Sequence, residues 1–230
     1  MKKISKRFRN LKQLVEKESY LPEPAIELLK KTATAKFNEC AEVHISLNIN
    51  PKFADQQLRT TIILPNGTGQ DIKMALLLPD EKLSNEYKSL VYKMGSEDLL
   101  NDISQNKLDF DILITTPEMM PKLAKFGRIL GPKNLMPSPK SGTVTTDIIA
   151  TLNQFRKGKI EYRADKTGIV HSRFGKMSFS DKELLENLIS FYNSVLQNKP
   201  SGVKGKYVKS FYISTTMGPS IQIDYNDLKI

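Results

Sequence analysis

Residues 207–224 read YVKSFYISTTMGPSIQID, and the rest of the chain can be interpreted outward from this stretch. Two runs rich in β-branched and aromatic residues flank residues 214–220, a segment of small hydroxyl residues with one glycine, one proline and a central methionine. Because glycine and proline interrupt a strand pattern, this segment predicts an exposed turn with a protruding apolar side chain. On local grounds the turn only connects two strands, so its role depends on the rest of the chain.

The composition of the 230 residues predicts a globular protein with an anionic partner. Hydrophobic residues make up 39% and charged residues 26%, and the net charge is +10. Such an excess favours a polyanion or an anionic membrane surface as partner. No run of about 18 apolar residues predicts a membrane span, and no apolar segment follows the basic start as in a secretory signal. The single cysteine, Cys40, excludes an intrachain disulfide framework, so we expect a reducing, intracellular compartment.

The positive charge is concentrated at the two ends of the chain. Residues 1–67 hold 12 Lys and Arg against 7 Asp and Glu, residues 159–230 hold 11 against 7, and residues 68–158 hold 12 against 11. The ends therefore carry +9 of the +10. This distribution predicts that residues 1–67 and 159–230 fold together as a basic domain I and that residues 68–158 form an inserted domain II. The alternative is a chance fluctuation of charge along one domain.

The first end begins with an amphipathic pattern. Residues 2–15 place apolar side chains at helical spacing, and the positions between them include Lys6, Arg7 and Arg9. The basic face of this helix is either a solvated or membrane-surface face, or an arm that contacts phosphates.

Further patterns predict the other elements of domain I. A helix with Pro22 and Pro24 near its first turn runs toward Lys36, and Phe37 falls between this helix and the next strand. Residues 58–64 read as a strand, and strict alternation over 42–50 predicts a half-buried strand with His44 on its solvent face. Ser180 and Glu183 form a capping box that opens a strongly amphipathic helix. The turn sequence at 165–168 predicts a hairpin within residues 160–174. Lys204 and Lys206 add positive charge just before the opening stretch.

Domain II alternates short apolar runs with helical patterns. The runs are residues 72–78, 90–94 and 110–115, and the helical patterns are 81–89, 96–104 and 117–126. This order predicts a small parallel, three-layer α/β unit. Residues 127–140 form a long loop rich in Gly and Pro that carries Arg128 and Lys133, and a loop of that length is typically functional or mobile.

Residues that could carry out chemistry are sparse. Neither GxGxxG nor a P-loop lysine motif is present, and His44, His171 and Cys40 have no spacing typical of a zinc, Cys/His or Ser/His/Asp site. Asp109 and Asp111 share one face of an expected strand, where carboxylates are commonly solvated. We therefore expect no enzyme, metal, cofactor or small-molecule substrate. The enzymatic alternative is a phosphate-handling α/β protein that uses the loop at 127–140.

Seven motifs together resemble the universal L1 family of large-subunit ribosomal proteins, whose members form the stalk beside the tRNA exit site. They occur in the family's order along nearly the whole chain: TATAKF (32–37), LPNGTG (64–69), MGSEDL (94–99), GRILGP (127–132), LMPSPK (135–140), GTV (142–144) and STTMGP (214–219). PSP (137–139), YRAD (162–165) and GPS (218–220) are similar to the cyanobacterial and chloroplast branch. The resemblance predicts a place in the chloroplast stroma, with the bacterial cytoplasm as the alternative.

The resemblance implies an α/β fold of two domains, a split β-α-β sandwich built from both chain ends and an inserted Rossmann-like three-layer domain. It implies that domain I binds large-subunit rRNA to form the mobile stalk, beside other large-subunit components, and that domain II faces the exit-site tRNA and assists its movement or release. Cys40 stands where relatives often carry Thr or Ser, which puts a hydroxyl contact at that position in doubt. The alternatives are an extraribosomal RNA-binding protein and a translational repressor of its own mRNA.

Three sets of residues follow as expected contacts. The rRNA contacts that the resemblance implies are Lys36, Phe37, Ser214, Thr215, Thr216, Met217 and Gly218. The expected rRNA phosphate contacts are Lys6, Arg7, Arg9, Lys204 and Lys206, and the expected tRNA contacts are Arg128 and Lys133.

Overall fold

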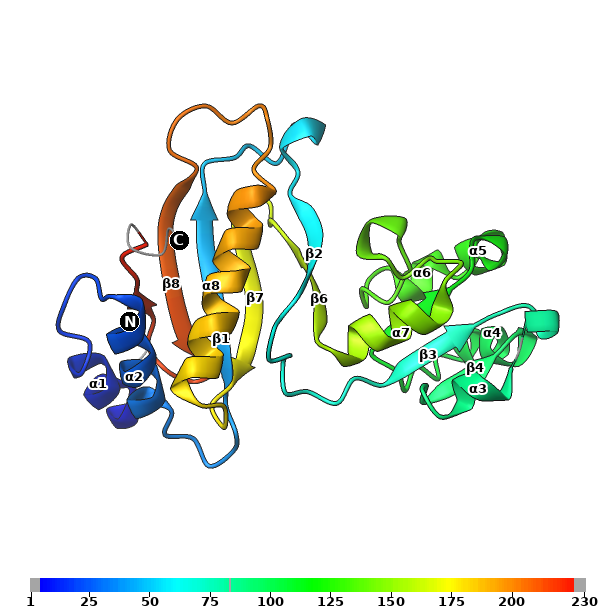
Figure 1. Ribbon diagram of the computed structural model, residues 1–230, viewed down its shortest axis with the longest axis horizontal. Coiled ribbons are helices and arrows are strands. Elements are labelled where there is room, and N and C mark those ends of the chain that lie inside the picture. Colours follow the sequence, from blue (N-terminus) through cyan, green and yellow to red (C-terminus); the bar gives the residue numbers. More distant parts are fainter. Residues whose placement is uncertain (1–4, 83, 226–230) are drawn as a thin grey trace. The chain divides into compact units, whose positions relative to one another are not determined.

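The computed structural model describes residues 5–82 and 84–225, and the chain forms two compact units (Figure 1). Unit 1 consists of Met1–Gly69 and Ile160–Ile230, and unit 2 is Gln70–Lys159. The first boundary between the units, after Gly69, lies two residues beyond the boundary predicted after residue 67, and the second, after Lys159, lies one residue beyond that predicted after residue 158. The predicted fold class, an α/β protein whose two ends build one domain around an inserted second one, is confirmed.

Unit 1 is built on a four-stranded antiparallel sheet in the order β7-β1-β8-β9. These strands are β1 (Cys40–Leu47), β7 (Ile169–Lys176), β8 (Val208–Thr215) and β9 (Ile221–Gln222). Burial alternates strictly along β1, so Val43, Ile45 and Leu47 face the core. His44 lies on the other face, opposite Tyr212 on one side and His171 on the other, which confirms the predicted half-buried strand.

Two helices supply the core that covers the inner face of this sheet. They are α2 (Pro22–Thr32) and α8 (Asp181–Gln197), and Figure 1 shows α8 lying along the sheet. Their buried side chains share one cluster with those of β1, β7 and β8, and the ring of Tyr192 stacks on Phe211 with centroids 5.4 Å apart. The predicted capping box is present, since Ser180 accepts from the Glu183 backbone and the Glu183 side chain accepts from the Ser180 backbone.

Two predictions for unit 1 were wrong in detail. Helix α2 ends at Thr32, four residues before Lys36, because Ala33 leaves the helical region at ψ 84° and the Thr32 hydroxyl turns back to the Leu29 carbonyl. The hairpin within 160–174 is not a paired ribbon either. Its first strand, β6 (Lys159–Arg163), joins β2 (Arg59–Ile63) in a separate two-stranded sheet, whereas β7 pairs with β1. The segments before and after the turn at 165–168 pair with each other in one isolated bridge, between Ala164 and Val170.

Unit 2 has three layers around a parallel sheet of order β4-β3-β5. The strands are β3 (Met74–Leu77), β4 (Lys93–Gly95) and β5 (Ile112–Thr115). Alternate residues of β3 enter two different cores, Ala75 and Leu77 on one face, Met74 and Leu76 on the other. Both faces of the sheet are therefore covered, as parallel sheets require.

Short helices surround this sheet. They are α3 (Asn85–Lys88), α4 (Glu97–Ser104), α5 (Met120–Ala124), α6 (Gly127–Leu130) and α7 (Ile148–Arg156), with 3-10 turns η2 (Asp80–Lys82), η3 (Pro117–Met119) and η4 (Pro139–Ser141). The two remaining elements, in unit 1, are α1 (Lys6–Gln13) and η1 (Ala54–Gln56). None of the described helices has the length and apolar character that a membrane crossing requires.

Candidate nucleic-acid interface

The turn after β8 exposes two side chains and buries their neighbour. Thr215, the last residue of β8, is 2% exposed, whereas Thr216 is exposed and Met217 is 50% exposed. The turn is closed by a hydrogen bond from the Gly218 N–H to the Thr215 carbonyl (3.2 Å). A Cβ at Gly218 would lie 2.3 Å from the Thr215 hydroxyl oxygen, so only glycine fits the turn as it stands. The predicted exposed turn with an apolar tip is therefore present.

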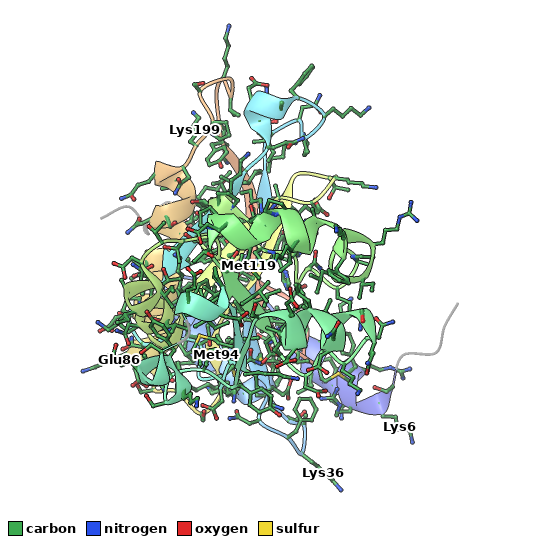
Figure 2. The ribbon with its side chains drawn as sticks, turned by 90° about the vertical axis from the view of Figure 1, so that its right-hand side faces the viewer. Lys6, Lys36, Glu86, Met94, Met119 and Lys199 are labelled. Carbon is green, nitrogen blue, oxygen red and sulfur yellow. The ribbon has the colours of Figure 1, made fainter. Side chains whose placement is uncertain are left out.

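The loop between α2 and β1, residues 33–39, carries the other two residues of the expected rRNA site. Lys36 is exposed and points away from the protein (Figure 2), and Phe37 is 55% exposed. A phenylalanine so open to solvent gains little from burial in the protein and is available for contact with a partner.

Glu39 joins this loop to the turn. Its side chain is 1% exposed, and its two carboxylate oxygens accept hydrogen bonds from the Ala35 N–H (2.9 Å) and the Met217 N–H (3.0 Å). Burial raises the pKa of this carboxyl, but these two backbone bonds and the charge of Arg7 hold the pKa below its usual value overall. Glu39 was not among the predicted site residues. It stands as a single acid between Phe37 and a strand, and nothing in that position distinguishes a buried acid from an exposed one.

Helix α1 is fixed to the same site through Arg7. The guanidinium donates to the Met217 carbonyl (2.9 Å) and to the Thr34 hydroxyl (3.0 Å), so it contacts both the turn and the loop. In this structure Arg7 therefore positions the turn. Lys6 and Arg9 lie on the same helix, and both are exposed.

Thr216 and Ser214 connect the turn to β1. The Thr216 hydroxyl accepts from the Cys40 N–H (3.0 Å), and the Ser214 hydroxyl lies 3.2 Å from His44 Nε2. His44 Nδ1 in turn lies 2.9 Å from His171 Nδ1. Burial and then the neighbouring His171 lower the pKa of His44, so the folded protein disfavours its charged form.

Lys204 and Lys206 are not part of this site. Both are exposed and precede Val208, the first residue of β8, whereas the turn follows Thr215, the last. A strand of that length spans about 24 Å. These two lysines therefore lie at the opposite end of the sheet from the turn, and their predicted contact with rRNA phosphates stays a prediction.

Arg128 and Lys133 lie in unit 2, on α6 and in the turn that follows it, and both are exposed. The segment 127–140 is more ordered than a plain loop. Leu130 is buried in the core of unit 2, and Leu135 and Met136 pack against the same cluster.

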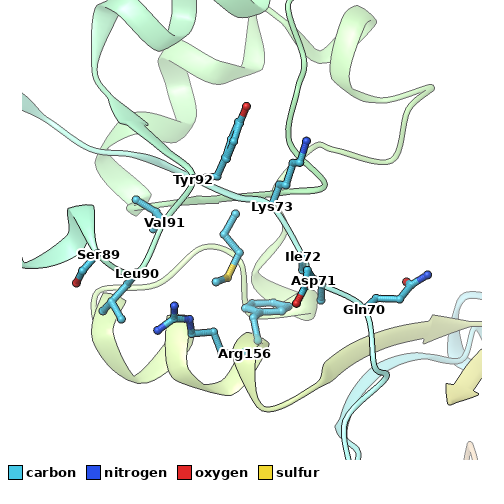
Figure 3. A pocket seen from close by; sticks show the side chains of 11 residues that line it. Gln70, Asp71, Ile72, Lys73, Ser89, Leu90, Val91, Tyr92 and Arg156 are labelled. Atoms are coloured by element: carbon cyan, nitrogen blue, oxygen red, sulfur yellow. The ribbon is translucent and has the colours of Figure 1, made fainter. Parts of the chain in front are cut away.

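Unit 2 also contains a hollow of about 470 Å³ near its first residues (Figure 3). Lys73, Tyr92 and Arg156 line it, and the Lys73 ammonium lies 5.0 Å from the centre of the Tyr92 ring. The hollow is at the amino-terminal ends of β3 and β4, whereas α/β sheets bind nucleotides at the carboxyl ends of their strands. Among the described residues, no three His, Cys, Asp or Glu side chains are grouped as a metal site would need.

Comparisons with known proteins identify the family of this chain. The model of the ribosomal protein L1p/L10e family matches residues 29–219. The chain belongs to this family. Relatives include the large ribosomal subunit protein uL1c of Trieres chinensis, which is 55% identical over 98% of this chain and 99% of its own. The large ribosomal subunit proteins uL1 of Prochlorococcus marinus (strain NATL1A) and Synechococcus sp. (strain WH7803) are each 53% identical, over 100% and 97% of this chain and 97% and 95% of their own.

Family membership confirms two predictions made from the sequence. The resemblance that the seven motifs carried is correct, and the matched region contains all of them. The family consists of structural ribosomal proteins, so the chain is not an enzyme. The phosphate-handling alternative is thereby removed.

Proposed function

We propose that this protein is a structural constituent of the large ribosomal subunit and binds large-subunit rRNA through unit 1. The proposal is supported by relatives that share more than half of the residues and are named as large-subunit proteins. The observation that carries it is the Glu39 bridge between Ala35 and Met217, two positions 182 residues apart in the chain. The bridge places the loop of Lys36 and Phe37 beside the turn, as a single composite site requires.

The chemistry of the site suits folded RNA. An RNA helix hides its major-groove edges from side chains, so proteins bind it through shape, phosphates and ribose hydroxyls. A fixed turn supplies shape, the Thr216 side chain and nearby backbone groups supply polar contacts, and the exposed Met217 and Phe37 supply apolar contact with sugars or unstacked bases. Lys36 and the exposed cations of α1 supply phosphate contacts, which add affinity but little sequence preference.

Unit 2 completes the proposal. The exposed side chains of Arg128 and Lys133 are its candidates for contact with the exit-site deacylated tRNA, whose movement or release the rRNA-bound stalk would assist. The relatives comprise a chloroplast form and cyanobacterial forms. We propose the chloroplast stroma as the compartment, with the bacterial cytoplasm as the alternative.

Two substitutions in the full-length protein test the rRNA site. Thr216→Val removes a polar partner and Met217→Ala removes an exposed anchor, and each should weaken binding to the stalk fragment of large-subunit rRNA by roughly 1 to 3 kcal/mol. Thr146→Val, at an exposed position of unit 2, is the matched control and should bind as the wild type does. Unchanged affinity in both turn variants would remove the turn from the site.

A further inference from the structure

Three loops meet at the end of the unit 1 sheet that lies away from the turn. They are residues 48–57 after β1, residues 164–168 before β7 and residues 198–207 before β8. The Asn48 N–H donates to the Tyr207 carbonyl (2.7 Å), and the Leu47 N–H donates to the Gly168 carbonyl (2.9 Å). Figure 2 shows Lys199, in the third loop, at the opposite end of unit 1 from Lys36. The three loops, together with Arg59 of β2 and Glu161 and Arg163 of β6 beside them, therefore form one continuous surface, which we call the second basic surface.

This surface is strongly positive. Its cations, all on exposed residues, are Lys52, Arg59, Arg163, Lys166, Lys199, Lys204 and Lys206. Its acids are Asp55, Glu161 and Asp165, which leaves a net charge of +4. Unit 1 as a whole has 22 Lys and Arg against 14 Asp and Glu, or +8. Half of its net charge thus lies at the end that the turn does not occupy.

The acids of this surface are largely committed to other groups. Glu161 forms an ion pair with Arg59. Asp165 is engaged by its own turn, where Oδ1 accepts from the Thr167 and Ile169 N–H groups, both at 2.8 Å. By contrast, Lys52, Lys166 and Lys204 form no ion pair with any described residue. These three ammonium groups keep their charge available to a partner.

The surface is also hollowed. A depression of about 580 Å³ is lined by the cationic residues Arg59, Arg163 and Lys166, by His171, Asp165 and Gln57, and by the apolar residues Pro51, Leu58 and Ala164. Cationic and apolar residues that share one depression suit a sugar-phosphate segment, because the phosphate can meet the charges and the sugar can meet the apolar groups. Phe53, 55% exposed, is the one large apolar side chain that the described part of this surface presents to solvent. A single such side chain provides little apolar area for a lipid surface.

We propose that the second basic surface binds the phosphate backbone of RNA, so that unit 1 holds RNA at both ends of its sheet. This inference rests on the proposed function, since it assigns to the same rRNA a second contact about 24 Å from the turn, the length of β8. An RNA strand that follows the sheet from the turn would meet the depression. An acidic protein segment is the competing partner that the charge alone would also accept.

The salt dependence of binding tests the proposal. Each phosphate contact contributes about 0.7 to 0.9 to the slope of log affinity against log salt concentration. The full-length triple variant Lys52→Ala, Lys166→Ala, Lys204→Ala should therefore lower the slope for the stalk rRNA fragment by about 2 to 3. The matched control is Lys88→Ala, Lys107→Ala, Lys125→Ala, three exposed lysines of unit 2, which should leave the slope unchanged. All substituted residues are exposed, and equal melting temperatures show that each variant is folded.

The outcomes separate this proposal from the proposed function. A lower slope in the first triple variant, with the control unchanged, supports the second contact. An unchanged slope in the first triple variant overturns the second contact. The second contact is also overturned if the first triple variant loses binding to polyglutamate but not to the rRNA fragment, because that result would indicate an acidic protein partner. Met217→Ala should weaken affinity with no change in slope, because it removes no charge. If Met217→Ala leaves rRNA affinity unchanged while the first triple variant still lowers the slope, the turn is not an rRNA contact, and the second basic surface is still supported.

Discussion

Replacing Glu39 by glutamine should loosen the site without changing any residue that faces RNA. The carboxylate is buried and accepts from two backbone N–H groups, those of Ala35 and Met217. A glutamine side chain has one carbonyl oxygen, so it can serve only one of them and presents its own N–H₂ to the other. Leaving one buried N–H without an acceptor costs about 1 to 3 kcal/mol, and the surviving bond loses its charge assistance, so we expect a total near 2 to 3 kcal/mol. Because 1.4 kcal/mol is a factor of ten, a loss of about 2 to 3 kcal/mol should lower rRNA affinity by about 30- to 140-fold.

Two assays separate the effects of Glu39→Gln. Urea unfolding followed by circular dichroism should show a free energy of unfolding lower by about 2 kcal/mol, and filter binding to the stalk rRNA fragment at fixed salt should show the lower affinity. Glu18→Gln, which removes the same charge from an exposed side chain, should change neither quantity. Wild-type affinity in Glu39→Gln would refute the reasoning, because the loop and the turn would then not depend on the shared carboxylate.

Three further predictions concern single residues of unit 1. Gly218→Ala should weaken rRNA binding at least tenfold, because its Cβ would meet the Thr215 hydroxyl at 2.3 Å, whereas Gly127→Ala, with nothing within 4 Å of the new Cβ, should bind normally. The pKa of His44 is lowered in the folded state, so His44 contributes stability above pH 6.5, and this contribution is lost as the pH falls below 6.5. Between pH 7 and pH 5.5 the melting temperature of His44→Gln should therefore drop less than that of the wild type. Asn187 is fully buried and bonds the Asn66 N–H and two backbone carbonyls, so Asn187→Ala should lower the free energy of unfolding by about 2 to 4 kcal/mol in urea titrations, and an unchanged midpoint would contradict this.

The elements with strong local signals were predictable from the sequence. β1 alternates because one face is buried, and α8 begins at a capping box whose two hydrogen bonds involve residues three apart. α7 was not predicted, although Asp147 caps it and Ile148, Leu152 and Phe155 lie on one face. Its β-branched start and its polar middle have weak helix propensity, so packing against the sheet determines it.

Features that depend on the pairing of distant segments were not predictable. The strands on either side of the 165–168 turn enter different sheets, because β7 is the neighbour of β1 and β6 the neighbour of β2. Lys204 and Lys206 precede the turn closely in sequence. The eight-residue strand β8 separates them from the turn, however, so they lie at the other end of the sheet. The burial of Glu39 depends on two backbone N–H groups that converge only in the folded chain.

The contact between Met217 and rRNA can be measured directly by NMR of methyl-labelled methionine. In the full-length protein with the stalk rRNA fragment added, the Met217 methyl signal, assigned through Met217→Leu, should shift. The signals of Met94 and Met119, in unit 2 (Figure 2), should keep their positions, since Met119 is buried and Met94 partly buried. A Met217 signal that stays in place while the RNA is bound would contradict the assignment of the turn as the rRNA-binding element.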